Sequence, residues 1–177
     1  MNQAGSDSFP WLGVEDSYQF PAPEGATPEG IIGVGGNLSP GMLLSAYRQG
    51  IFPWFDERDP IIWWCPDPRF VLYLDELHVS RSLGRILRRG EFRLTLDADF
   101  GAVIHACATT PRPGQRGTWI TQDMELAYRR LHELGFAHSC EAWQGERLVG
   151  GIYGVSIGRM FYGESMFAHV SNASKAA

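Results

Sequence analysis

The C-terminal part of the chain alternates with the period of β-strands rather than helices. Three strand-like segments, residues 139–143, 147–155 and 159–167, are separated by Gln144-Gly145-Glu146 and Ile157-Gly158. Connections this short join antiparallel neighbours, because parallel strands need a long crossover. The pattern therefore predicts an antiparallel meander.

The residues before the meander mix helix and strand signals. We expect strands at residues 70–74 and 92–96, and helices at residues 78–89, 100–108 and 121–134, the last with Thr121 as N-cap. A further helix should begin after Ser171 or Asn172. Helices and an antiparallel sheet in this order predict an α+β fold.

The first third of the chain reads differently. It is irregular to about Gly30, and a short helix then follows Ser39 as N-cap and Pro40 as first residue, ending before Gly50. Four prolines within residues 51–68 exclude a long helix there and favour a rigid connector. We place a boundary near Pro68, which gives an N-terminal domain over 1–68 and a second domain over 69–177.

The sequence reaches Ala177 about one turn into the last expected helix. A single turn does not sustain itself, and a sheet of this kind needs cover on both faces. We therefore expect the natural protein to be longer and the second domain to be incomplete at its C-terminal end.

Composition narrows the class of protein. The chain is 44% hydrophobic and 20% charged, as in ordinary globular proteins, and it shows no long apolar run and no secretory leader. We expect a cytoplasmic monomer without membrane contact. Its three cysteines, Cys65, Cys107 and Cys140, are widely spaced, and neither they nor the five histidines form a zinc pattern, so no metal is expected.

Charge is distributed unevenly along the chain. Residues 1–68 carry nine acidic and two basic side chains, whereas residues 69–177 carry eleven acidic and thirteen basic ones. Four of the basic ones, Arg81, Arg85, Arg88 and Arg89, share one face of an expected helix. This face is either merely solvated or a docking surface for phosphates, which arginine binds well.

Glu164 lies within the apolar run Met160 to Phe167. A carboxylate among such side chains loses hydration, so it is either a buried hydrogen-bond acceptor or a group kept for a substrate. Trp54 and Trp119 lie just outside expected regular elements, where an indole can line a cleft or stack on a base, although a place in the core is the alternative.

The order of the elements resembles the acetyltransferase-like fold of the GNAT superfamily. Members of that superfamily hold acetyl-CoA in a glycine-containing loop before a helix, and the corresponding residues 167–175 contain no glycine. The resemblance therefore implies a GNAT-like domain whose acyl donor is not acetyl-CoA.

Several longer motifs point to one family within that fold. They are Gly35-Gly36-Asn37-Leu38-Ser39-Pro40, Tyr47-Arg48-Gln49-Gly50-Ile51-Phe52-Pro53-Trp54-Phe55, Trp63-Trp64-Cys65-Pro66-Asp67-Pro68-Arg69, Gly117-Thr118-Trp119-Ile120-Thr121, Gly163-Glu164-Ser165-Met166-Phe167 and Asn172-Ala173-Ser174-Lys175. In this collinear order they resemble the leucyl/phenylalanyl-tRNA-protein transferases.

The resemblance implies transfer of Leu or Phe from an aminoacyl-tRNA to the N-terminal Arg or Lys of a protein, as a bacterial degradation signal, without cofactor or metal. Glu164 would be the active-site carboxylate. The residues around the aminoacyl-adenosine would be Trp54, Trp119, Ile152, Phe161 and Met166, and the tRNA-docking helix would carry Arg81, Arg85, Arg88 and Arg89.

The chain departs from the family pattern in three places. Gly84 stands where a relative has a further basic residue, and Ile152 stands where a relative has Met. The family's Asp-x-Gln motif, expected to help deprotonate the attacking amine, would lie beyond residue 177. Two rival functions remain open from the sequence, a CoA-dependent N-acetyltransferase and a non-catalytic RNA-binding module.

Overall fold

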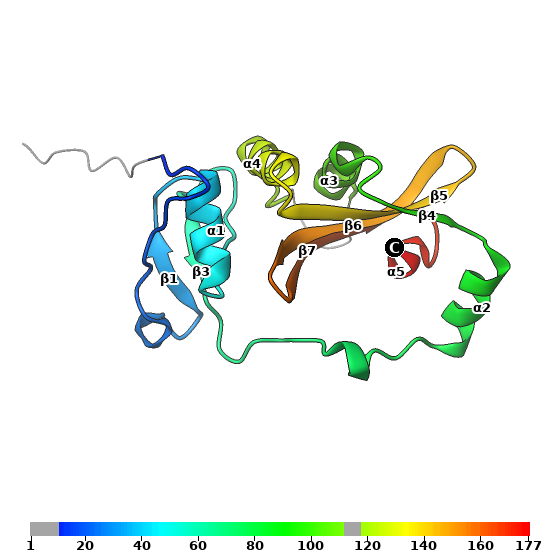
Figure 1. Cartoon of the computed structure of the whole chain (residues 1–177), viewed down its shortest axis with the longest axis horizontal. Helices are drawn as coiled ribbons and strands as arrows, with labels where there is room; N and C mark the ends of the chain where they lie inside the picture. The colour runs from blue at the N-terminus through cyan, green and yellow to red at the C-terminus, as the bar shows by residue number, and fades with distance from the viewer. Residues whose placement is uncertain (1–10, 112–117) are drawn as a thin grey trace, which may run out of the picture. The chain divides into compact units, whose positions relative to one another are not determined.

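The computed structural model describes residues 11–111 and 118–177 and confirms the α+β fold (Figure 1). The chain divides into two compact units, one ending at Arg69 and the other beginning at Phe70. Each unit has its own sheet and its own buried residues.

The first unit packs one helix with a small antiparallel sheet. Its elements are the 3₁₀-helix η1 (Pro23–Gly25), the strand β1 (Ile31–Val34), the helix α1 (Pro40–Arg48), and the strands β2 (Phe52–Pro53) and β3 (Ile62–Trp64). Among the described residues the strand order is β1-β3-β2. Ser39 occupies the N-cap position and Pro40 opens the helix, as expected, but the Ser39 hydroxyl accepts the Leu12 N–H at 3.1 Å and makes no cap hydrogen bond. Leu43, Leu44 and Tyr47 are fully buried.

This small sheet was not foreseen in the sequence. Residues 51–68 were expected to be a rigid connector, but Phe52–Pro53 and Ile62–Trp64 pair with each other, and Ile62–Trp64 also pairs with Ile31–Val34. Strands of two to four residues are too short to show a period of two, and prolines mask the signal further.

The second unit carries a larger antiparallel sheet of order β4-β5-β6-β7 in the part of the chain that is described. Its elements are η2 (Leu74–Glu76), α2 (Arg81–Arg89), β4 (Arg93–Leu96), α3 (Phe100–Thr109), α4 (Gln122–Glu133), β5 (Ala137–Gln144), β6 (Arg147–Ile157), β7 (Met160–Ala168) and α5 (Ala173–Ala176). The meander is confirmed. Gly145 and Gly158, with φ of 58° and 60°, provide the tight turns that join its strands.

Helices cover the sheet on both sides. α3 and α4 lie on one face, and the short α5 lies on the other, where Ala173 packs with Ala142 and Val149 (Figure 1). Thr121 caps α4 by accepting a hydrogen bond from the Met124 N–H at 3.3 Å, as the sequence predicted.

Two local expectations were wrong. Residues 70–74 form no strand, and the helix expected from residue 78 begins at Arg81, where Ser80 caps it. No residue of α2 is buried, and Leu87 on the side away from the arginines is 40% exposed. The period of a sequence pattern shows which residues share a face of a helix or strand. It does not show whether that face packs against another element.

One carboxylate is fully buried in the second unit, and it is Glu141 of β5. Its Oε1 accepts a hydrogen bond from the Ser139 hydroxyl at 2.6 Å, and its Oε2 accepts from the Thr95 hydroxyl at 2.5 Å and from the Ala98 N–H at 3.3 Å. These donors replace the water that burial removes. Glu141 is therefore a buried hydrogen-bond acceptor, the structural role that the sequence analysis had considered for Glu164.

A second carboxylate, Asp97, links the turn after β4 to β5. Its Oδ1 accepts from the Ser139 N–H at 2.8 Å, and its Oδ2 lies 2.7 Å from the His138 Nδ1. Partial burial acts to raise the pKa of Asp97, but these hydrogen bonds and the positive charge of His138 and His132 outweigh it and hold that pKa below its ordinary value.

We predict that Asp97→Asn destabilises the protein near neutral pH. A carboxylate with a lowered pKa stabilises the fold above its unfolded-state pKa of 3.8, and this contribution disappears as the pH falls through the lower folded-state pKa. Because the side chain is 34% exposed, we expect a loss of only about 1 kcal/mol. Urea unfolding of both proteins at several acidic pH values should show the gap closing; a gap independent of pH would contradict the ionic role. Asp75→Asn, at an exposed position of the same unit, is the control.

Candidate aminoacyl-transfer site

Glu164 occupies a β-bulge in β7. In the pairing of β6 with β7, Tyr153 lies opposite Ser165 and Gly154 lies opposite Gly163, so Glu164 is the extra residue of the bulge. A bulge interrupts the ladder and re-aims the side chain of the extra residue. In the described part of the sheet β7 pairs only with β6, so this carboxylate lies along a sheet edge.

The helix side of this strand pair is defined by Tyr153. Its ring packs edge-on against Phe100 of α3 and Tyr128 of α4, with centroid distances of 5.8 and 5.7 Å. Ser165 pairs with Tyr153 and is buried on the same side. Successive side chains of a strand alternate, so Ile152 and its partner Met166 point to the opposite face.

Ile152, Phe161 and Met166 share that second face of the sheet. A Cβ atom placed on Gly163 would lie 3.8 Å from Ile152 Cδ1 and 3.9 Å from Phe161 Cε1, so these two side chains flank the glycine. Phe161 is 53% exposed and Met166 is 51% exposed. We call the three residues the apolar surface of β6 and β7, and about half of its aromatic and thioether area is open to a ligand.

The carboxylate of Glu164 lies near the helix layer. The Tyr128 hydroxyl of α4 lies 3.5 Å from its Oε2, which is a long hydrogen bond, and Glu164 is half-buried. The sequence analysis missed Tyr128 as a neighbour of the site. Its position on the buried face of α4, with Met124 and Leu131, was the available signal, because that face must pack on the sheet that carries Glu164.

Trp119 and Trp54, the two tryptophans expected at the site, lie on different units. Trp119 is half-buried in the segment before α4, and Gly117 of the same motif lies outside the described residues. Trp54 belongs to the first unit, where it is 49% exposed and its ring lies 5.4 Å from that of Trp64. Trp54 therefore presents an open indole on its own unit.

The four arginines of the expected docking helix all lie on α2 and are exposed: Arg81, Arg85, Arg88 and Arg89. Arg89 is 3.8 Å from Glu91, a loose and exposed ion pair. Ser80 caps the helix by accepting the Leu83 N–H at 3.2 Å, and Gly90 ends it with φ of 63°. The cluster is therefore held on a helix with well-defined ends.

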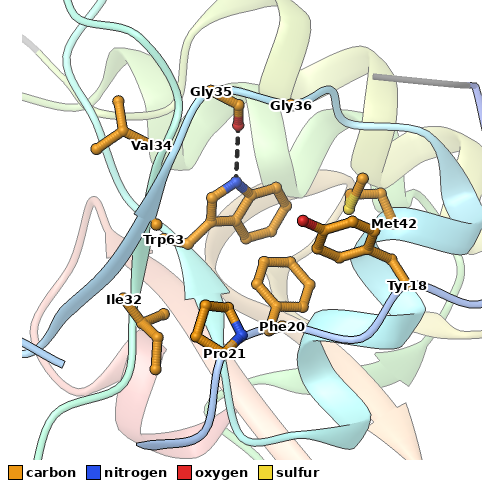
Figure 2. A pocket seen from close by; sticks show the side chains of 10 residues that line it. Tyr18, Phe20, Pro21, Ile32, Val34, Gly35, Gly36, Met42 and Trp63 are labelled. Atoms are coloured by element: carbon orange, nitrogen blue, oxygen red, sulfur yellow. Dashed lines mark hydrogen bonds between the residues drawn. The ribbon is translucent and has the colours of Figure 1, made fainter. Parts of the chain in front are cut away.

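A separate pocket of about 90 Å³ lies in the first unit (Figure 2). The rings of Tyr18, Phe20 and Trp63 line it, together with Met42, and the Trp63 Nε1–H donates to the Gly35 carbonyl at 2.9 Å. Its lining includes no carboxylate, histidine or cationic side chain. This pocket therefore offers no carboxylate or imidazole that could take part in acid–base chemistry.

Two features are absent from the described residues, 11–111 and 118–177. No helix there is long and apolar enough to span a bilayer, and no three His, Cys, Asp or Glu side chains are grouped as metal ligands.

Comparison with known proteins identifies the family. The model of the leucyl/phenylalanyl-tRNA protein transferase family matches residues 71–177, and that of its N-terminal domain matches residues 36–67. These two ranges fall in the second and the first unit respectively.

Curated relatives agree with the family models. The leucyl/phenylalanyl-tRNA–protein transferase of Syntrophus aciditrophicus is 60% identical over 89% of this chain and 66% of its own length. Those of Ectopseudomonas mendocina and Nitratidesulfovibrio vulgaris are 56% and 55% identical, over 93% and 94% of this chain and 73% and 71% of their own lengths. The chain thus spans about two thirds of the length of such relatives, and it belongs to the leucyl/phenylalanyl-tRNA protein transferase family.

Proposed function

We propose that this chain transfers Leu or Phe from an aminoacyl-tRNA to the N-terminal Arg or Lys of acceptor proteins, marking them for degradation. The main support for this proposal is the position of Glu164 in a bulge at the edge of the sheet. The exposed apolar surface of β6 and β7 lies on the same strand pair. Membership of the family supports it, because the relatives are named for aminoacyl transfer between tRNA and protein.

The reaction is an aminolysis of the aminoacyl ester. The cationic α-ammonium of the acceptor first gives up one proton to solvent, and the neutral nitrogen then forms a bond to the aminoacyl carbonyl carbon. The bond from that carbon to the ribose oxygen breaks, and a second proton passes from the nitrogen to that oxygen, so the products are a peptide bond and a tRNA with a free ribose hydroxyl. No covalent enzyme intermediate is needed. Holding the two partners in an oriented pair can supply several kcal/mol of the barrier reduction.

We assign the aminoacyl side chain to the apolar surface of β6 and β7, where Ile152, Phe161 and Met166 would contact it. Burying a bulky unbranched side chain there is favourable by roughly 25 cal/mol for each Å² removed from water. Trp54 and Trp119 would stack on the adenosine end of the tRNA, since indole faces accept any base. Glu164 would attract and orient the cationic N-terminus of the acceptor.

We assign tRNA docking to α2. Arg81, Arg85, Arg88 and Arg89 are exposed on one short helix, and guanidinium groups bind phosphate in a fixed, forked geometry. A merely solvated face is the alternative. It is less favourable, because four like charges on nine residues repel one another when no anion is bound.

We further propose that the second unit is a GNAT-like domain, that the protein acts as a cytoplasmic monomer, and that it uses no cofactor. The antiparallel meander with helices on both faces supports the first point. The glycine-free segment 167–175 disfavours acetyl-CoA as the acyl donor.

Transfer of labelled Phe from its tRNA to an Arg-initiated peptide tests the function directly. The same peptide beginning with Ala is the control, since its N-terminus lacks the second positive charge. We expect label in the Arg peptide only. Binding of tRNA without any transfer would favour an RNA-binding module, and binding of acetyl-CoA in calorimetry would favour an acetyltransferase.

A further inference from the structure

Gly163 lies beside the apolar surface of β6 and β7 and leaves room above the sheet. It lies opposite Gly154 in the pairing of β6 with β7, directly before the bulged Glu164. Apart from the adjacent residues Tyr162 and Glu164, a Cβ atom on Gly163 would have two heavy atoms within 4 Å among the described residues, Ile152 Cδ1 and Phe161 Cε1, both at ordinary van der Waals distances. Gly163 is also exposed.

The neighbouring Gly154 has a different role. A Cβ atom there would overlap the Tyr162 carbonyl oxygen and would come within 2.5 Å of Phe161 Cζ. Gly154 is therefore needed for the fold and for the position of the Phe161 ring, which lies across it. Gly163, in contrast, can accept a methyl group without displacing its neighbours.

We propose that Gly163 sets the preference between aromatic and aliphatic aminoacyl groups, by leaving a flat floor between Ile152 and Phe161. This inference rests on the proposed function, because it assigns the aminoacyl side chain to this surface. A planar phenyl ring gains most of its contact by lying flush on backbone and on the flanking side chains. A methyl group on the floor would hold the ring away, whereas a leucyl group can turn around χ1 and χ2 to avoid it.

The test is Gly163→Ala, measured by binding rather than by turnover. The probes are 3′-amino-3′-deoxyadenosine carrying phenylalanine or leucine through an amide, which cannot be transferred readily. Calorimetry with the whole chain should show that the preference for the phenylalanyl over the leucyl probe falls by about tenfold, the effect of roughly one methylene in an apolar site.

Two further variants make the result decisive. Gly25→Ala adds the same methyl in open space on the first unit and should leave both affinities unchanged. Ile152→Val combined with Gly163→Ala removes the Cδ1 atom beside the new methyl, so it should restore part of the preference for the phenylalanyl probe.

The outcomes separate this inference from the proposed function. If both probes bind the unchanged protein and Gly163→Ala leaves their ratio unaltered, the role of Gly163 is overturned while the aminoacyl site stands. If neither probe binds the unchanged protein, the aminoacyl site itself is overturned, and the role of Gly163 with it. Circular dichroism of the variant should match that of the unchanged protein, since the added methyl meets no backbone atom beyond the adjacent residues.

Discussion

Replacing Glu164 by Gln should lower aminoacyl transfer by at least about tenfold, equivalent to about 1.4 kcal/mol of transition-state stabilisation. Gln preserves the size and the hydrogen-bonding oxygen but removes the charge that would hold the cationic N-terminus of the acceptor. The affinity for tRNA should not change, because the carboxylate lies on β7 rather than on the arginine helix α2. Single-turnover transfer and filter binding measure the two effects separately.

Two variants control this experiment. Glu146→Gln removes the same charge from the exposed β5–β6 turn of the same unit and should leave transfer unaltered. Tyr128→Phe keeps the charge of Glu164 and removes the hydroxyl 3.5 Å from it, so it should have a smaller effect than Glu164→Gln. Equal transfer by Glu164→Gln and the unchanged protein would show that the carboxylate is not part of the chemistry.

Replacing Arg85 and Arg88 together by Ala should weaken tRNA binding without unfolding the protein, since both side chains are exposed on α2. If about four phosphates are contacted, the logarithm of the affinity should fall with the logarithm of salt concentration with a slope of about -3. Loss of two contacts should bring the slope to about -1.5. Binding titrations at several salt concentrations give the slope.

The matched control removes the same charge elsewhere. Arg147, the first residue of β6, and Arg159, in the turn between β6 and β7, are exposed on the second unit, and their joint replacement by Ala changes the net charge equally. A purely long-range attraction would make both double variants alike. A slope that stays the same when Arg85 and Arg88 are replaced would remove α2 as the docking surface.

The sequence predicted the elements that have a strong period or a clear boundary. The meander over 137–168 followed from alternation and glycine turns, and α1 and α4 followed from their capping residues. The small sheet of the first unit did not, because its strands are two to four residues long and their pairing depends on contacts distant in sequence. Local patterns carry little information about such pairing.

The candidate site was predictable as a set of residues but not as an arrangement. Glu164 was identified because a carboxylate in an apolar strand loses hydration and must be compensated by a hydrogen bond or a bound group. Strict alternation would place it on the same face as Ile152 and Met166, and the bulge that re-aims it leaves no trace in the residue types around it. Tyr128 was missed for the same reason, since its proximity to Glu164 depends on how α4 packs on the sheet.

The bulge at Glu164 also bears on how such a site can change over evolutionary time. Residues 160–163 and residues 165–168 both pair with β6, and Glu164 is the extra residue between these two paired segments. A substitution there alters the chemistry at the sheet edge while the buried and the apolar faces keep their partners. If Glu164 acts as proposed, selection can therefore change this group without disturbing the pairing of β6 with β7.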